Sequence, residues 1–312
     1  MPTPFVHLHL HTEYSLVDGT VRIPALVEKA RALGMPAIAV TDQHNLFALV
    51  KFYQAAEAAG IKPIIGAEVL LRSPDDSEQV ARLVLLCQNR TGYLNLCQLL
   101  SRAYLEGQHH GMPFLRRDWV LEHADGLIAL SGGREGDIGQ AILGGHPNRA
   151  LQLARNWRRH FPERFYIEIQ RTDREQEPQH EQAVLHLAAE LDLPVVASND
   201  VRFLERADFR AHEARVCIHD GRLLSDKRRE RRYSEEQYLK SPDEMQALFA
   251  DLPEALENAW RLAMRCNLEM NFGTYHLPDF PTPDGQSVED YLHQVAAEGL
   301  ELRLARLPGA PP

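Results

Sequence analysis

The chain has 312 residues, of which 44% are hydrophobic and 25% charged, and its net charge is −10. These values are typical of a soluble globular protein with one large domain or two ordinary ones. The acidic balance argues against a chain that wraps nucleic acid by itself. The chain has no run of 18 apolar residues and no signal peptide at its start, which predicts a cytoplasmic protein without a membrane span. Its four cysteines form no CxxC pair, which argues against a thiolate zinc site.

The stretch FVHLHLHTEYSLVDG, residues 5–19, opens the chain with three histidines that alternate with apolar residues. Side chains alternate faces along a strand, so His7, His9 and His11 share one side of a predicted strand. Neutral imidazole is the commonest side-chain metal ligand, which suggests a metal site. A strand with a polar, solvated face explains the triplet equally well, and the pattern alone leaves both alternatives open.

Strand and helix patterns then alternate along the chain. Near-continuous apolar strands that alternate with helices predict an α/β fold with a mainly parallel sheet, and about seven such units favour a closed barrel. VCIHDG, 216–221, is a candidate for one more strand. The predicted strands are 5–10, 37–42, 62–71, 81–88, 126–133, 164–170 and 195–200, and the predicted helices are 21–34, 46–60, 92–107, 146–162 and 181–194.

Polar residues gather where these strands end. In parallel barrels the chemistry lies at the carboxyl ends of the strands. The residues expected there are His9, His11, Asp42, Glu68 and Asp200. Their common position favours a real or ancestral site over a solvated strand face.

After about residue 220 the regular alternation of strand and helix patterns ends. A polar stretch and two helices are followed by NFGTYHLPDFPTPDG, 271–285, which is rich in Pro and Gly and is interpreted as a linker. A last helix is predicted with Ser287 as its N-cap, ending at PGAPP. We therefore predict a domain over 1–270, and a segment 271–312 that contains the linker and the first helix of another domain.

Six motifs occur along the chain in this order: HLHTEYSLVDG, AVTDQHNLFALVKFY, KPIIGAEV, NRTGYLNLCQLLSRAYLEG, LSGGREGDIG and VVASNDVRF. Together they resemble the PHP (polymerase and histidinol phosphatase) domain family. More closely, they resemble the N-terminal PHP domains of bacterial DNA polymerase III alpha subunits. The resemblance implies a distorted seven-stranded (β/α) barrel, and LPDFPTPDGQSVEDYL resembles the passage from that domain into the palm of the polymerase.

The resemblance also implies a set of metal ligands. Metal-binding members of the family hold up to three ions with nine ligands. The positions that match are His9, His11, Asp18, Glu68 and Asp200, and the positions that depart from the family pattern are Gln43, Tyr104, Gly133 and Arg202.

These departures predict a vestigial metal site. Gln and Gly are poor or absent ligands for a zinc-like ion, and Tyr is uncommon. Arg202 places a permanent positive charge where a cation would lie. We expect no complete trinuclear cluster and at most one weakly bound divalent ion. We also expect Arg202 within ion-pair distance of Asp200, Glu68 or Asp18.

Two functions follow from the resemblance. The first is a catalytically inactive scaffold within a DNA-directed DNA polymerase, a nucleotidyltransferase. In this role the domain docks a proofreading exonuclease subunit and braces the rest of the polymerase chain, and it meets DNA only through the holoenzyme. The second is a metal-dependent phosphoesterase or 3′–5′ exonuclease. The carboxylates that hold Mg²⁺ for polymerisation are expected in the palm, beyond residue 312.

The basic run KRRERR, 227–232, is interpreted as a solvated loop, with single-stranded template contact as the alternative.

Overall fold

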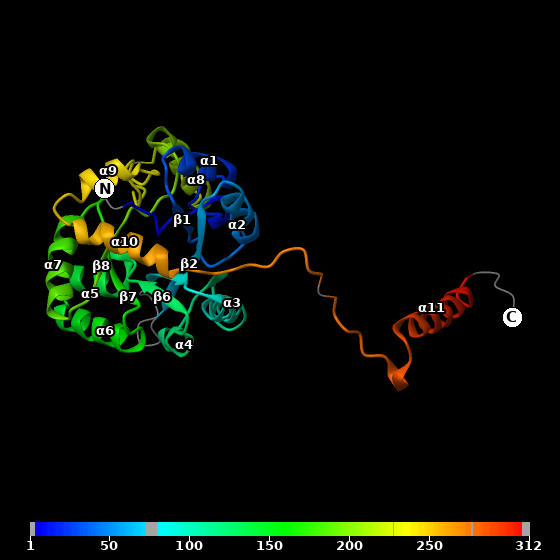
Figure 1. Ribbon diagram of the computed structural model, residues 1–312. Coiled ribbons are helices and arrows are strands. Elements are labelled where there is room, and N and C mark those ends of the chain that lie inside the picture. The colour runs from blue at the N-terminus through cyan, green and yellow to red at the C-terminus, as the bar shows by residue number, and fades with distance from the viewer. Residues whose placement is uncertain (1–3, 73–79, 227, 276, 308–312) are drawn as a thin grey trace. The chain divides into compact units, whose positions relative to one another are not determined.

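The computed structural model describes residues 4–72, 80–226, 228–275 and 277–307 (Figure 1). The chain divides into two compact units, Met1–Glu269 and Met270–Pro312, and each is described by itself. The predicted helix stop at PGAPP, 308–312, and Lys227 of the basic run lie outside the described residues. Within the described residues, no helix is both long enough and apolar enough to cross a membrane.

The first unit is built on a curled six-stranded sheet with the order β1-β2-β3-β6-β7-β8. The pairs β1–β2, β6–β7 and β7–β8 are parallel, whereas β3 is antiparallel to both β2 and β6. The predicted strand 81–88 is therefore present as β3, and it runs antiparallel in a sheet that was predicted to be mainly parallel. The strands are β1 Ala37–Val40, β2 Lys62–Arg72, β3 Val80–Cys87, β6 Leu127–Leu130, β7 Phe165–Gln170 and β8 Val195–Ser198.

The seven-stranded barrel is not confirmed, because the predicted first strand is not a regular one. Residues 5–11 run between β1 and the end of β8, where Leu10 and Val201 form an isolated parallel bridge: His11 N–H donates to Val201 C=O, and Val201 N–H donates to His9 C=O. On the other side, Ala39 N–H donates to His7 C=O and Thr41 N–H donates to Leu10 C=O. The two donors are two residues apart in the chain, whereas their acceptors are three residues apart, so the N-terminal segment contains one extra residue here. Such an extra residue is a bulge that interrupts the ladder.

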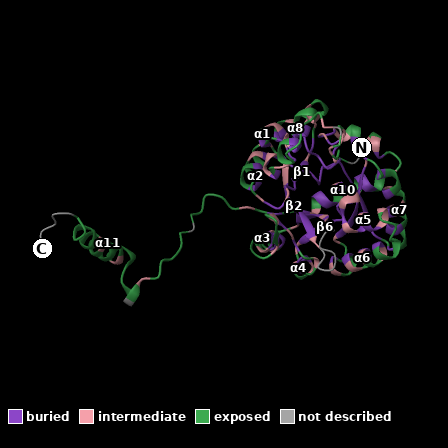
Figure 2. Cartoon of the chain, turned by 180° about the vertical axis from the view of Figure 1, so that it is seen from behind, coloured by how far each residue is buried: buried purple, intermediate pink, exposed green. Residues whose placement is uncertain are grey.

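The helices cover the outside of the sheet, and their apolar faces fill the space against it (Figure 2). Trp157 of α6 stacks on Phe165 of β7, with ring centroids 5.8 Å apart. The predicted strand 216–221 is wrong: its first residues belong to α8, because they continue a buried helical face that includes His212. The helices of this unit are α1 Ile23–Ala32, α2 Leu49–Ala58, α3 Arg90–Leu105, α4 Arg117–Glu122, α5 Asp137–Leu143, α6 Pro147–His160, α7 Glu177–Glu190, α8 Phe209–His219, α9 Pro242–Leu248 and α10 Pro253–Arg265. Shorter elements are η1 Glu13–Ser15, η2 Gly133–Glu135, η3 Arg206–Asp208 and a hairpin of β4 Gln108–His109 with β5 Met112–Pro113.

The helix ends follow the local signals in the sequence. Pro147 occupies the first turn of α6, where its missing N–H costs no hydrogen bond. Ser241 and Glu244 form a reciprocal capping box at the start of α9. These caps fix where α9 begins and therefore where the preceding loop must end, and that loop covers the site described below.

The second unit contains η4 Pro283–Gly285 and the helix α11 Val288–Leu304. As predicted, Ser287 is the N-cap of α11, and its hydroxyl accepts the Asp290 N–H at 3.1 Å. The side chains of α11 are exposed or half-exposed along its length, including apolar ones such as Leu292 (Figure 2).

Histidine burial predicts that this fold loses stability in acid. Burial lowers the pKa of His180 in α7 from 6.5 to about 4. Between pH 4 and pH 6.5, His180 is therefore protonated in the unfolded chain and neutral in the folded chain. The stability contribution is complete above pH 6.5 and is lost as the pH falls towards 4, by up to about 3 kcal/mol.

His180→Gln should therefore flatten the decline in unfolding free energy between pH 6.5 and pH 4, measured by urea titration at several pH values. The matched control is His186→Gln in the same helix, where the ring is exposed to solvent. Identical pH profiles for His180→Gln and the unsubstituted protein would contradict the prediction.

Candidate functional site: a buried cluster of histidines, carboxylates and arginines

The three histidines of the N-terminal segment are all buried, with exposed fractions of 0–2%. The interpretation of a solvated polar strand face is therefore wrong. The three histidines do not all meet in one place. His7 donates from Nε2 to the Lys240 carbonyl at 2.8 Å, and burial lowers its pKa to about 4. His9 and His11 instead meet each other, with their Nε2 atoms 3.1 Å apart.

The hydrogen bonds of His9 and His11 define which ring carries the extra proton. His9 Nδ1 lies 2.8 Å from Glu168 Oε1, and its Nε2 lies 3.2 Å from Glu68 Oε2. Burial alone would lower the pKa of His9, but the carboxylates of Glu168 and Asp200 raise it to about 10. His9 is thus an imidazolium that donates from both ring nitrogens.

His11 is the neutral partner. Burial, and then the positive charge of Arg202, lower its pKa to about 3. Its Nε2 accepts from His9, and its Nδ1–H donates to Ser15 Oγ at 2.9 Å. The Ser15 hydroxyl then donates to Asp42 Oδ1 at 2.8 Å. A continuous hydrogen-bonded chain therefore runs from Glu168 through both histidines to Asp42.

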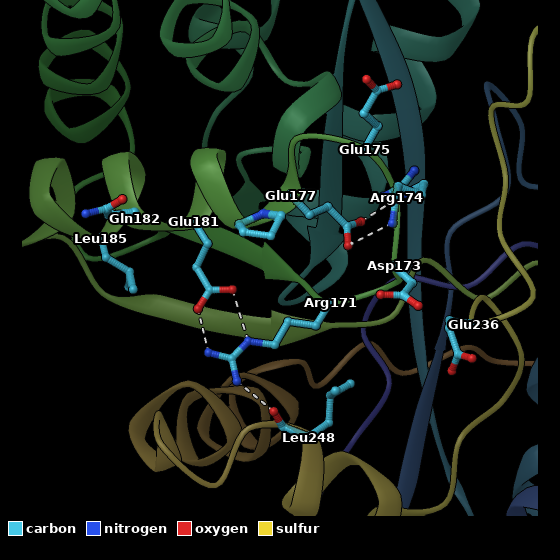
Figure 3. Close-up of a pocket in the computed structure, with 11 residues that line it drawn as sticks. Arg171, Asp173, Arg174, Glu175, Glu177, Glu181, Gln182, Leu185, Glu236 and Leu248 are labelled. Atoms are coloured by element: carbon cyan, nitrogen blue, oxygen red, sulfur yellow. Dashed lines mark hydrogen bonds and ion pairs between the residues drawn. The ribbon is translucent and has the colours of Figure 1, made fainter.

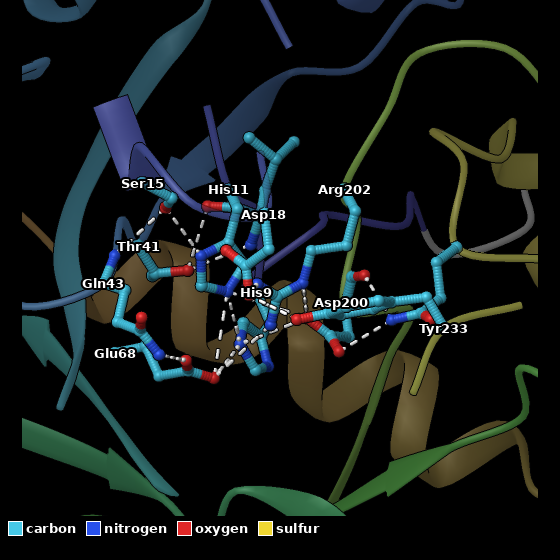
Figure 4. Close-up of polar contacts among 12 residues, drawn as sticks. His9, His11, Ser15, Asp18, Thr41, Gln43, Glu68, Asp200, Arg202 and Tyr233 are labelled. Atoms are coloured by element: carbon cyan, nitrogen blue, oxygen red, sulfur yellow. Dashed lines mark hydrogen bonds and ion pairs between the residues drawn. The ribbon is translucent and has the colours of Figure 1, made fainter. Parts of the chain in front are cut away.

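Arg202 lies at the centre of the remaining carboxylates and is fully buried (Figure 4). Its Nε donates to Asp200 Oδ1 at 2.8 Å, its Nη1 lies 2.8 Å from Asp18 Oδ2, and its Nη2 lies 3.7 Å from Glu68 Oε2. The prediction that Arg202 lies within ion-pair distance of Asp200, Glu68 or Asp18 is confirmed, and Arg202 reaches all three. Although burial alone would raise them, the pKa values of Asp18 and Asp200 are held below the ordinary range by Arg202.

Two more arginines that the sequence analysis missed touch the same carboxylates. Arg82 Nη1 lies 3.3 Å from Glu68 Oε2, and Arg174 Nη1 lies 3.6 Å from Asp200 Oδ2. Arg82 was detectable in the sequence as the only charged residue within the apolar run of β3. Arg174 follows β7 in a polar loop, and nothing in that loop marks it as buried. Glu168, in the middle of β7, was missed although it is a carboxylate inside an apolar strand.

The positions that depart from the family pattern fall into two groups. Gln43 and Gly133 border the cluster: Gln43 Nε2 donates to Glu68 Oε1 at 3.1 Å, and a Cβ at Gly133 would meet the Gln170 side chain at 3.0 Å. Tyr104 is 41% exposed at the end of α3 and so lies outside the buried cluster. Glu68 itself lies in the middle of β2, and the prediction that it follows a strand end is wrong.

A segment that we call the strap, residues 233–240, closes the cluster from solvent. Tyr233 OH donates to Asp18 Oδ2 at 2.5 Å, and Gln237 Nε2 donates to Asp200 Oδ2 at 2.8 Å. The backbone of the strap also bonds to the chain after β8, where Arg202 N–H donates to Gln237 C=O at 2.8 Å. Seven residues of the cluster are consequently no more than 3% exposed: His9, His11, Asp18, Glu68, Glu168, Asp200 and Arg202. Sequence reasoning missed both strap residues, because a polar loop gives no signal for burial.

Among the described residues, one set of side chains has a spacing that could hold a metal ion. Donor atoms of His9, His11 and Glu68 all lie within 4.8 Å of one another, which is a geometry that can hold a divalent cation. Both ring nitrogens of His9 already have partners, Glu168 at Nδ1 and His11 with Glu68 at Nε2, so a metal ion would have to displace a hydrogen bond of His9. The carboxylates of Asp18 and Asp200 are already neutralised by Arg202. The expected ligands Asp18 and Asp200 therefore lie beside the histidines without offering free charge.

Comparison with known proteins identifies the family. The sequence profile of the PHP domain matches residues 7–172, more than half of the chain. The chain belongs to the PHP domain family. This PHP domain is 55% identical over 304 residues to the DNA polymerase III subunit alpha of Pseudomonas aeruginosa and 49% identical over 303 residues to that of Escherichia coli. Each alignment covers 97% of this chain and 26% of the relative. The chain thus spans about a quarter of the length of the curated relatives it matches.

Solved structures with lower similarity include an amidohydrolase from Chromobacterium violaceum with bound sulfate and no metal. It has 15% sequence identity and a TM-score of 0.45, and the match covers 67% of this chain and 96% of the other. A protein named as a metal-dependent phosphoesterase from Bifidobacterium adolescentis has 15% identity and a TM-score of 0.40, over 64% of this chain and 88% of the other.

The cluster predicts that Arg202 is essential for stability. Arg202→Met leaves Asp18 and Asp200 buried without their cation, and removing one member of a buried ion pair costs about 3–5 kcal/mol. Arg202→Lys keeps the positive charge but lacks the planar guanidinium that contacts several carboxylates at once. It should therefore lower the free energy of unfolding by a smaller amount.

Urea unfolding at neutral pH measures both changes. The exposed Arg31→Met in α1 is the control and should change the unfolding free energy by no more than about 0.5 kcal/mol. If Arg202→Met lowered the unfolding free energy by as little as the control does, the ion pairs of Arg202 would not be needed for stability.

Proposed function

We propose that this chain is the PHP region of a bacterial DNA polymerase III alpha subunit. In this role it is a structural scaffold and a docking surface for a proofreading exonuclease, and it does not hydrolyse phosphate esters itself. The identity of 47–55% to relatives of that name over nearly the whole chain supports the assignment to this polymerase. Polymerisation itself would then reside in the parent enzyme, a DNA-directed DNA polymerase that uses Mg²⁺ in its palm.

The observation that carries the proposal is the position of Arg202. A guanidinium within 2.8 Å of two carboxylates supplies the positive charge that metal ions would otherwise supply. Arginine cannot lower the pKa of a bound water or act as a Lewis acid, as a metal ion does. The cluster keeps its charge balance and loses the means to generate a nucleophile.

Burial of the cluster supports the same conclusion. Hydrolysis requires a phosphate ester to reach the reacting groups, and the strap places Tyr233 and Gln237 between those groups and solvent. The domain boundary predicted near residue 270 agrees with this role, because it would leave α11 to begin the palm. We propose that the second unit, 271–312, is that linker and first helix, and that the full protein works in the cytoplasm on DNA bound by the holoenzyme.

A metal-dependent phosphoesterase or 3′–5′ exonuclease is the second candidate. The observation in its favour is the compact donor set of His9, His11 and Glu68. If one weakly held divalent ion binds there, it would supply a polarised water. His9 would first have to release a proton, and the strap would have to open. The two candidates therefore differ in metal content and in strap mobility.

Metal analysis separates the two candidates. After dialysis against Mn²⁺ or Zn²⁺, we expect less than one ion per chain and no increase in unfolding temperature. Arg202→His should behave differently, because it removes the guanidinium and restores a donor next to free carboxylates; divalent ions should raise its unfolding temperature by several degrees. Stoichiometric metal in the unsubstituted chain, together with hydrolysis of a phosphate ester, would favour the second candidate.

The scaffold role predicts that the histidines are dispensable for polymerisation. In the full polymerase, His9→Gln with His11→Gln should leave nucleotide incorporation nearly unchanged, because glutamine keeps polar atoms in the cluster. The chain of 312 residues should capture the purified proofreading exonuclease in a pull-down. A nuclease activity that copurifies with this chain and vanishes in the double variant would contradict the scaffold role.

A further inference from the structure

Leu16 lies in a strained turn, and its side chain is 62% exposed. The Val17 N–H donates to the Ser15 carbonyl at 2.6 Å, which closes a three-residue turn around Leu16. The backbone angles of Leu16 are φ 58° and ψ −50°, a conformation that residues with a Cβ rarely adopt. Such strain persists where surrounding contacts impose it, and it is common at functional sites. The fold bears this conformational cost without burying the Leu16 side chain, which favours a role for that side chain at the surface.

Contacts on two sides hold this turn in its conformation. Arg215 of α8 donates from Nε and Nη2 to the Leu16 carbonyl at 2.9 and 2.7 Å, and from Nη2 to the Glu13 carbonyl at 3.2 Å. Towards the buried cluster, the Ser15 hydroxyl accepts the Gln43 N–H at 3.1 Å (Figure 4). The turn is therefore fixed before a partner arrives, which lowers the entropic cost of binding.

Exposed apolar side chains from two other segments lie next to this turn. Ile218 follows Arg215 by one turn of α8 and is 82% exposed. The Asn45 side chain donates to the Tyr14 carbonyl at 2.9 Å and accepts the Phe47 N–H at 3.0 Å, which brings Phe47, 62% exposed, to the turn. Apolar side chains that gather on a surface mark interaction sites, whereas single ones do not. We call this surface the rim patch, and it consists of Leu16, Phe47, Ile218, Lys51 and Arg215.

The rim patch carries free positive charge, although the chain as a whole has a net charge of −10. Lys51 donates to the Tyr14 hydroxyl at 2.6 Å and Arg215 to backbone carbonyls, and neither has an ion pair among the described residues. The carboxylates in the segments that form the patch, 13–18, 45–51 and 215–226, all have a cationic partner. These pairs are Glu13 with Arg22, Asp18 with Arg202, Asp220 with Arg232 and Asp226 with Arg222.

The cavities beside the strap do not have such one-sided charge. A cavity of about 680 Å³ lies between the loop after β7, α7 and the end of α9, and its Arg171 is occupied by Glu181 and the Leu248 carbonyl (Figure 3). A neighbouring cavity of about 580 Å³ contains the exposed carboxylates of Asp173 and Glu235 among its arginines. Mixed charge of this kind selects a partner of neither sign, whereas the rim patch selects for negative charge.

We infer that the rim patch docks a segment of the proofreading exonuclease in which carboxylates flank apolar side chains. This inference rests on the proposed docking function and names its surface. The apolar side chains of the segment cover Leu16, Phe47 and Ile218, and its carboxylates meet Lys51 and Arg215. Single-stranded nucleic acid would also satisfy the positive charge, but it binds by stacking its bases on aromatic rings, and two of these three apolar side chains are aliphatic. A polypeptide segment matches both the apolar surface and the charge.

The test measures the affinity of the chain of 312 residues for the purified proofreading exonuclease from the same organism, by isothermal titration at low and high salt. The apolar variant is Leu16→Gly with Ile218→Ser, because glycine adopts the backbone angles of the turn without strain. The charge variant is Lys51→Glu. The matched controls are Leu105→Ser at the end of α3, where the side chain is 84% exposed, and Arg31→Glu on the surface of α1.

We expect the apolar variant to weaken binding about tenfold at both salt concentrations. Lys51→Glu should weaken binding by a smaller factor at low salt and by still less at high salt, because salt screens exposed charges. Both controls should bind like the unsubstituted chain. Leu16→Gly alone should not lower the unfolding temperature, since it removes the strain of the turn, so its loss of binding cannot be attributed to unfolding.

Equal affinity in the patch variants and the controls would show that the exonuclease docks elsewhere, which overturns this inference and leaves the docking function intact. Failure of the unsubstituted chain to bind the exonuclease would overturn both. The inference is also wrong if the patch variants instead change the affinity for a single-stranded oligonucleotide, measured by fluorescence anisotropy, or self-association of the chain, measured by light scattering. Normal exonuclease binding by the patch variants within the full polymerase would likewise contradict it.

Discussion

The ion pairs of Arg202 with Asp18 and Asp200 hold together parts of the chain that are far apart in sequence. Asp18 belongs to the turn after the N-terminal segment, whereas Asp200 and Arg202 follow β8. Without a positive charge at this point, the chain would bury several carboxylates that repel one another. The guanidinium is suited to the position because it is planar, remains protonated and offers several N–H donors in a fixed geometry.

The charges around this centre balance locally. Arg82 and Arg174 approach Glu68 and Asp200 from the side of β3 and of the loop after β7, and the protonated His9 lies between Glu68 and Glu168. Hydrogen bonds to charged groups are stronger than those between neutral groups, and they are least disturbed where water is excluded. The cluster therefore favours one arrangement of the strand ends. It contributes more to the uniqueness of that arrangement than to net stability, because desolvation of each ion offsets much of the attraction.

The fold was largely predictable from the sequence, since its information is local. The buried strands at 37–40 and 195–198 appear as short apolar runs, and helices between them as periodic patterns, with a proline in the first turn of α6 and of α7. The N-terminal segment was not predictable as a bulged chain that makes an isolated bridge in place of a regular ladder. Its register depends on Thr41, whose hydroxyl accepts the Leu10 N–H at 2.9 Å in place of a backbone carbonyl. Alternation of His7, His9 and His11 indicated a common face, whereas the bulge separates His7 from the other two.

The site was predictable at the positions that carry a family motif and unpredictable where tertiary packing alone brings residues in. Tyr233 and Gln237 lie in a polar stretch that resembles any solvated loop, and only the folded chain shows that they face inward. The same stretch illustrates how a buried cluster can have consequences at the surface. Because one side of the strap is bonded to Asp18 and Asp200, its other side presents Glu235 and Glu236 in a fixed position. The strap thus covers the buried cluster with one side, and the same hydrogen bonds hold its other side in place at the surface.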